Sequence, residues 1–232
     1  MSTLLHHLGH RLGEWGQVGL GLAFPPPPPV ENTTRRIAPP FCAQCGEPFE
    51  GSILGYFLCP NCQEREWTLK WARAAYRAEG PVRETIHDFK YRHHFHQLHP
   101  LADWLEDGFR QFAACERWDA LVFVPLHPVR RRDRGFNQAE ELSRVLGKRQ
   151  RLPILPCLKR TRPTEKQTLL SRGARLRNLL GAFEFKSRFD VAGLNLLIID
   201  DVFTTGATAE ACARILSANG ARRIAALTIA RA

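Results

Sequence analysis

The sequence predicts an α/β fold, with a parallel β-sheet covered by helices and a small cysteine module ahead of it. From residue 119 onward, short apolar runs alternate with segments of helical periodicity, which is the pattern of strand–helix–strand units. Four of the seven cysteines form two Cys-x-x-Cys pairs before that region. A chain of 232 residues is long enough for one sizeable core and one accessory module.

Composition divides the chain into four parts. Residues 1–40 contain the polyproline stretch "FPPPPPV" and are predicted to form a disordered tail, with a membrane or partner anchor as the alternative. Residues 41–64 hold the cysteines and are predicted to form a zinc ribbon. Residues 65–118 are predicted to be a helical connecting segment, which leads to an α/β domain over residues 119–232.

Hydrophobic periodicity predicts the individual elements. In the connecting segment, "EWTLKWARAAYRA" (66–78) and "LADWLEDGFRQFA" (101–113) have helical spacing. Further elements are expected in this order: a strand at 119–127, a helix at 137–148, a strand or extended run at 152–160, a basic loop, short helix and strand over 171–185, a strand at 194–200, a helix at 208–220 and a strand at 222–230.

The charge of the chain is concentrated in one segment. The formal net charge is +10, and residues 130–188 alone carry 17 lysines and arginines against five aspartates and glutamates, a net charge of +12. Such a segment favours a polyanion or a multiply phosphorylated ligand, although a solvated basic surface is the alternative. No apolar run reaches about 18 residues and no secretory signal is visible, so we expect a cytoplasmic protein without a transmembrane segment.

The cysteine pairs have the spacing of a metal site. Cys42 and Cys45 form one pair, Cys59 and Cys62 the other, and 13 residues separate the pairs. Each pair presents two thiolates from a tight turn, and two such turns complete a tetrahedral site for structural Zn²⁺. The alternative is a set of four buried or redox-active thiols, but thiols of a cytoplasmic protein stay reduced and favour metal binding over disulfides.

The stretch "LLIIDDVFTTGAT" (196–208) predicts a ribose 5-phosphate site. The apolar strand is expected to stop at Asp200 and Asp201, which places two carboxylates at the carboxyl end of the sheet. Neighbouring carboxylates repel each other unless a partner bridges them, and two ribose hydroxyls are such a partner. The hydroxyl-rich turn, with its glycine and the helix that follows, offers backbone N–H groups to a phosphate. The alternative is a plain strand with a polar turn.

These thirteen positions resemble the phosphoribosyl-diphosphate (PRPP) signature of type I phosphoribosyltransferases. The resemblance implies their Rossmann-like parallel sheet and places Asp200 and Asp201 at the ribose hydroxyls of the catalytic site. It implies Mg²⁺ bound together with PRPP. The residues implied around the 5-phosphate are Thr204, Thr205, Gly206, Ala207 and Thr208.

A second segment, "VFVPLHPVRRRDRGFNQAEELSR" (122–144), offers a strand end followed by four arginines within five residues. Arginine presents forked donors that suit phosphate oxygens. The run "RDRGFNQAEELS" resembles the ComF family of phosphoribosyltransferase-like proteins, and "VPLH" resembles the pyrophosphate loop of amidophosphoribosyltransferases. By position, the resemblance implies Leu126 and His127 at the pyrophosphate, followed by Arg134.

The basic segment 159–185 carries a further ComF pattern and suits a mobile cover over an anionic ligand, with a plain surface loop as the alternative. The resemblance implies PRPP contacts from this segment. The matching residues are Thr164, Gln167, Leu170, Arg175 and Asn178, of which Gln167 and Arg175 are the candidate ligand contacts.

The ComF resemblance covers about residues 41–232 and includes the zinc ribbon. It implies a PRPP-binding protein of DNA uptake or utilisation, with single-stranded DNA and a competence helicase as candidate partners. An active phosphoribosyltransferase of nucleotide metabolism, with an unknown acceptor, remains the alternative. Single-strand binding normally needs aromatic side chains among the basic ones, and only Phe136 lies among the arginines in the sequence.

Overall fold

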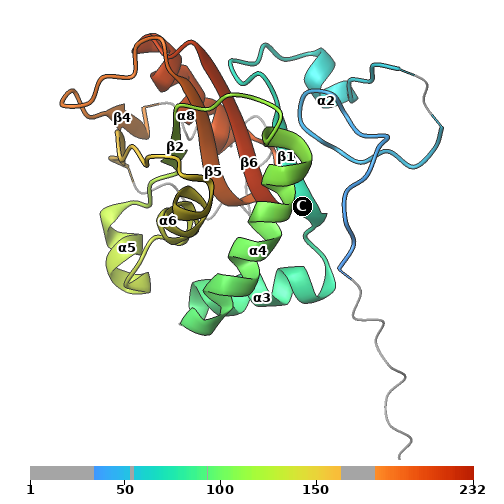
Figure 1. Cartoon of the computed structure of the whole chain (residues 1–232), viewed down its shortest axis with the longest axis horizontal. Helices are drawn as coiled ribbons and strands as arrows, with labels where there is room; N and C mark the ends of the chain where they lie inside the picture. The colour runs from blue at the N-terminus through green and yellow to red at the C-terminus, as the bar shows by residue number, and fades with distance from the viewer. Residues whose placement is uncertain (1–33, 53–54, 93, 163–180) are drawn as a thin grey trace, which may run out of the picture. The chain divides into compact units, whose positions relative to one another are not determined.

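A four-stranded parallel sheet organises the chain (Figure 1). The computed structural model describes residues 34–52, 55–92, 94–162 and 181–232, and Thr34–Ala232 form one compact unit. The strands lie in the order β1–β6–β5–β2. Their bounds are β1 (Ala72–Arg77), β6 (Arg223–Arg231), β5 (Asn195–Phe203) and β2 (Ala120–Phe123).

Helices cover both faces of this sheet, which explains why β5 is apolar on both faces. Leu197 and Ile199 pack in the cluster that holds the buried residues of α3 (Gly80–Tyr91), α4 (Leu98–Gly108) and α6 (Gln138–Gln150). The intervening Leu196 and Ile198 pack in the other cluster, with α8 (Ala207–Ala218). The prediction of an α/β protein with a parallel sheet is therefore confirmed.

Smaller elements surround the sheet. They are α2 (Pro60–Gln63), a 3-10 turn at Phe95–Gln97, a π-helical turn at Phe109–Ala113, α5 (Pro128–Arg134), and an antiparallel pair of β3 (Leu158–Arg160) and β4 (Phe183–Phe185). Ile154 forms a parallel bridge with Leu121 on the free edge of β2. The basic loop and helix expected at 171–180 lie outside the described residues. No helix in the described ranges has the length and apolarity needed to cross a bilayer.

The helix predicted over 66–78 is wrong, because Ala72–Arg77 is the strand β1. Alanine and arginine favour helices locally, but this segment pairs with β6 along one edge, and pairing overrides propensity. On its other edge, the Ile37 N–H donates to the Ala75 carbonyl at 2.9 Å. The residues just before the cysteines, which the sequence assigned to the tail, therefore pack against the sheet.

A buried carboxylate fastens the segment after the cysteines to α8. Glu210 is 1% exposed and accepts backbone hydrogen bonds from Thr68 at 3.0 Å and from Leu69 at 3.3 Å. Arg214 donates to the same carboxylate at 3.0 Å. The arrangement connects residues 142 positions apart in the chain and holds the stretch before β1 against the helix that follows β5.

Replacing Glu210 with Gln should therefore destabilise the protein. The amide can turn only one oxygen toward these donors, and leaving a buried donor unpaired costs about 1–3 kcal/mol. Chemical denaturation should show this loss in the free energy of unfolding. The exposed Glu184→Gln, which breaks only a surface pair with Lys159, should cost about 1 kcal/mol or less. Equal stability of the two variants would contradict the fastening role.

Candidate functional site

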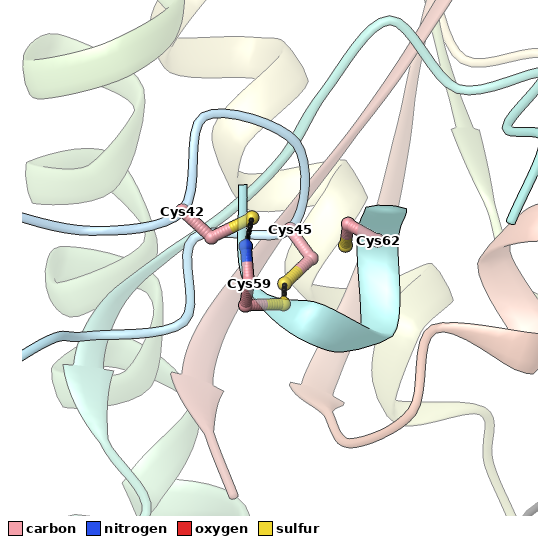
Figure 2. Close-up of side chains that lie close together, drawn as sticks. All are labelled: Cys42, Cys45, Cys59 and Cys62. Carbon is pink, nitrogen blue, oxygen red and sulfur yellow. Dashed lines mark hydrogen bonds between the residues drawn. The ribbon is translucent and has the colours of Figure 1, made fainter. Parts of the chain in front are cut away.

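The four paired cysteines come together in one buried cluster. Their sulfur atoms all lie within 4.8 Å of one another, and each cysteine is buried (Figure 2). The Sγ atoms of Cys45 and Cys59 are 3.7 Å apart, close to the separation of about 3.8 Å that two ligands at Zn–S bonds of about 2.3 Å have in a tetrahedron. The Cys59 N–H donates to Cys42 Sγ at 3.3 Å, which helps to position that sulfur. The structure brings together the four cysteines that the sequence groups as a candidate metal site.

The chemistry of this cluster fits a divalent cation. Burial raises the pKa of Cys45 to about 12, against the opposing charge of Arg231, and burial with the neighbouring Cys45 raises the pKa of Cys62 as well. Burial also raises the pKa of Cys42, but backbone hydrogen bonds outweigh it and bring the value to about 7. Four thiolates at this spacing therefore need a cation among them, and Zn²⁺ would supply that charge in a closed tetrahedral S₄ site.

The residues of the predicted phosphate turn lie between β5 and α8. Gly206 has a φ of +74° and lies immediately before the first residue of α8. A side chain there would meet the rings of Phe203 at 2.5 Å and Trp67 at 2.7 Å, so only glycine fits. Thr204, Gly206, Ala207 and Thr208 line one narrow cavity of about 20 Å³ together with Asp200, and that cavity has room for about one water molecule.

The strand β5 does not stop at the two carboxylates as expected, but runs on to Phe203. It continues because β6 pairs with it as far as Phe203, opposite Arg231. On the other side, β2 ends at Phe123, opposite Ile199. Asp200 and Asp201 therefore lie just beyond the carboxyl end of β2. On the other side of β5, the pairing with β6 continues past them.

Lys90 reduces the repulsion that the sequence predicts between these carboxylates. Its ammonium, from α3, pairs with Asp201, whose side chain is 7% exposed. Burial favours the neutral form of both aspartates. Together with the charge of Asp201, burial holds the pKa of Asp200 well above its usual value. For Asp201, Lys90 outweighs burial and lowers the pKa below its usual value. Lys90 therefore stabilises the charge of Asp201, while Asp200 bears the cost of burial and of the neighbouring charge.

The predicted pyrophosphate residues follow β2 at the same end of the sheet. The ring of His127 accepts a hydrogen bond from the Val129 N–H at 3.3 Å and so caps α5, while Leu126 precedes it. Arg134, at the end of α5, donates to Gln138, and its charge contributes to the lowered pKa of Asp201. Arg134 and Asp201 are thus close enough to interact. Gln167 and Arg175 lie outside the described residues.

Arg231 connects the cysteine cluster to the turn after β5. Its side chain is 7% exposed, and its guanidinium pairs with Glu47 and donates to Cys45 Sγ at 3.8 Å. The same guanidinium donates to the carbonyl of Thr204 at 2.8 Å. Arg65, three residues after Cys62, donates to the Thr205 carbonyl at 3.2 Å. The carbonyls of both threonines that open the turn are therefore bound by arginines that also contact, or closely follow, the cysteine module.

Comparison with known proteins gives the chain a family. No family model matches it. It is 32% identical to competence protein F of Haemophilus influenzae over 202 residues, which cover 83% of this chain and 85% of the relative. The chain belongs to the ComF family. Other ComF relatives are the DNA utilization protein YhgH of Escherichia coli (30% identity, 92% of this chain and 89% of the relative) and competence protein ComFC of Bacillus subtilis (26% identity, 85% and 80%).

Sequence reasoning missed two side chains of this ComF site. Arg231 follows an almost entirely apolar run in β6, and a charge at such a position is the signal that could have marked it. Trp67, which packs on Gly206, lies in the segment where a helix was expected. The sequence singles out Lys90 only through the stretch "DFKY", which resembles a ComF segment, and its pairing with Asp201 depends on the packing of α3.

Metal analysis tests the cysteine centre. We expect close to one Zn²⁺ per chain by elemental analysis, and Cys42→Ser should lose zinc and lower the melting temperature, since structural zinc contributes directly to folding. Cys157 is equally buried but lies outside the cluster, so Cys157→Ser should keep the zinc. Zinc-free protein with an unchanged melting temperature would show that the cluster is not a zinc site.

Proposed function

We propose that this ComF protein binds PRPP with a type I phosphoribosyltransferase-like site and acts in DNA uptake or utilisation. The observation that carries the proposal is the shared position of Asp200, Asp201 and the turn Thr204–Thr208 at one end of a parallel sheet. Ligands of parallel α/β proteins bind at the carboxyl ends of strands, and a helix N-terminus after a glycine turn suits a phosphate. Ribose hydroxyls and a 5-phosphate would satisfy both halves of this arrangement.

The remaining parts of PRPP have candidate partners at the same end of the sheet. The pyrophosphate, with Mg²⁺, would lie toward Leu126, His127 and Arg134, which follow β2. Gln167 and Arg175 stay predicted contacts from the segment outside the described residues. Lys90 keeps Asp201 ionised, so that this carboxylate can accept a hydrogen bond from a ribose hydroxyl.

The DNA role rests on the relatives. Two of them are named competence proteins and one a DNA utilization protein, and each aligns with at least 83% of this chain. The reduced state that the buried cysteine cluster needs suits the cytoplasm, where we place the protein. Single-stranded DNA and a competence helicase are the partners that such a role implies. PRPP would then be either a regulatory ligand of the protein or its substrate.

Transfer of the phosphoribosyl group to an acceptor is a second candidate function. The charged groups around Asp201, which are Lys90 and Arg134, favour it, because loss of pyrophosphate from C1 requires stabilisation of separating charge. Product analysis with PRPP, Mg²⁺ and a panel of bases, with and without single-stranded DNA, tests this function. A phosphoribosylated product identifies an enzyme, whereas binding without product leaves PRPP as a ligand.

Substitution of the aspartates tests the proposed site. Asp200→Asn and Asp201→Asn should each weaken binding of Mg²⁺-PRPP by roughly 10- to 150-fold, because a charge-assisted hydrogen bond contributes about 1.5–3 kcal/mol. Isothermal titration calorimetry measures this loss. The exposed Asp190→Asn removes the same charge far from the turn and should leave the affinity unchanged. Unchanged affinity in both site variants would refute the ribose-diol assignment.

Thermal melts of the same variants add an independent observation. From the sequence, both substitutions should leave stability unchanged or raise it by relieving repulsion. Because Lys90 pairs with Asp201, we now expect only Asp200→Asn to do so, while Asp201→Asn should melt lower with its lysine unpaired. A higher melting temperature for Asp201→Asn would contradict the pairing.

A further inference from the structure

A groove of about 570 Å³ opens beside the first residues of β6, and its lining shares Trp67 with the surroundings of Gly206 in the turn after β5. Three segments line it: the cysteine module, the stretch 67–71 before β1, and the connection from α8 to β6. The groove includes Arg223, the first residue of β6, whereas the turn at Thr204 contacts Arg231, the last. Eight steps of about 3.3 Å along the extended strand place these two arginines about 26 Å apart. The volume is within the range of ligand-binding clefts, about 300–1,000 Å³.

The lining of this groove is basic. Lys70, Arg222 and Arg223 contribute three positive charges, and no described residue that lines it is acidic. Glu116, which lies outside the lining, pairs with Arg223 at 2.8 Å. Arg222 donates only to the neutral side chain of Asn195, at 3.1 Å, and so keeps its net charge. The groove therefore favours an anion of some length over a neutral ligand.

The same groove is lined by aromatic side chains. Tyr56, from the cysteine module, is 78% exposed, the most exposed of the large hydrophobic residues in the described ranges. Trp67 is half-buried, and the guanidinium of Arg65 stacks on its ring at 4.0 Å. Trp71 forms the floor, buried against Trp118 at a ring separation of 5.8 Å. The exposed phenol ring of Tyr56, in a groove that Lys70 and Arg222 also line, offers a surface on which a planar, unpaired base can stack.

We propose that this groove binds single-stranded DNA. Sequence-tolerant recognition of a single strand combines a positively charged channel for the phosphates with aromatic rings for the bases, and both are present here. The sequence pointed instead to the arginines of α5, among which only Phe136 is aromatic. The structure buries Phe136, pairs Arg131 with Glu140 at 3.1 Å and places the Arg134 guanidinium over the ring of the exposed Tyr91, so that surface is less suited to bases. The inference rests on the DNA part of the proposed function.

Binding of a fluorescein-labelled oligothymidylate to the full-length, zinc-loaded protein, followed by anisotropy, tests the groove. Tyr56→Ala should weaken binding roughly 5- to 150-fold, because stacking of one base contributes about 1–3 kcal/mol, whereas Tyr56→Phe should keep the affinity. Arg222→Ala should weaken binding and lower the slope of log affinity against log salt by about 1. If Arg222→Ala weakens binding but Tyr56→Ala binds the oligonucleotide as tightly as the wild type, stacking in this groove is refuted.

Matched variants separate this groove from the other basic surface. Tyr91 is 61% exposed and stacks with Arg134 at 5.2 Å, so Tyr91→Ala removes an exposed tyrosine beside the arginines of α5. Arg83→Ala removes an exposed charge from α3. Both variants should bind the oligonucleotide as the wild type does. Loss of binding in Tyr91→Ala, or in the triple variant Arg131→Ala, Arg132→Ala, Arg134→Ala, with Tyr56→Ala unaffected, would place the strand on α5 and refute the groove.

The wild-type protein distinguishes failure of this inference from failure of the proposed function. Absence of oligonucleotide binding at low salt would refute both the groove and direct DNA handling, but not PRPP binding. Normal binding with unaffected groove variants would refute the groove alone. Tyr56→Ala should bind Mg²⁺-PRPP as the wild type does, since Tyr56 lies outside the turn after β5. Failure of unlabelled poly(dT) to displace the labelled strand, together with displacement by a free nucleotide or an acidic protein, would identify another occupant and refute the proposal.

Discussion

The buried guanidinium of Arg231 joins the two chemically distinct parts of this molecule. It lies between the acceptors Cys45 Sγ and Glu47 on one side and the Thr204 carbonyl on the other. A buried cation is stable only when anions or aligned dipoles surround it. A zinc tetrathiolate carries a net charge of about −2, so metal binding strengthens the anionic side of this contact. The geometry of the turn at residues 204–208 thus depends on the cysteine module.

Other contacts reinforce that dependence. Trp67 packs on Gly206, which must stay glycine, and Glu210 holds the backbone of Thr68 and Leu69 against the start of α8. Trp67, Thr68 and Leu69 follow the second cysteine pair closely in the chain, and they pack around α8, the helix that begins at the turn. The cysteine module is therefore part of the scaffold of the site rather than a separate appendage, and both ends of β6 take part in binding surfaces under our proposals.

Features that depend on residues close together in the chain could be predicted from the sequence. The apolar run of β5 and the paired cysteines have strong signals, because strand burial and metal geometry each require particular residues at fixed spacing. The strand β1 could not be predicted, since its alanines favour a helix until β6 and Ile37 pair with its edges. The contacts of Lys90 with Asp201 and of Arg231 with Thr204 join residues more than 25 positions apart, and only the packed fold shows them.

Calorimetric titration of Mg²⁺-PRPP into wild-type and Arg231→Lys protein, at equal measured zinc content, tests the central claim most directly. Lysine keeps the positive charge beside Cys45 but presents one compact ammonium, which cannot bridge to Thr204 as the guanidinium does. We predict one saturable PRPP site per wild-type chain and an affinity at least about tenfold weaker in the variant, the loss expected for a charged hydrogen bond. Absence of saturable PRPP binding by the wild type, or equal affinity in both proteins, would contradict the account.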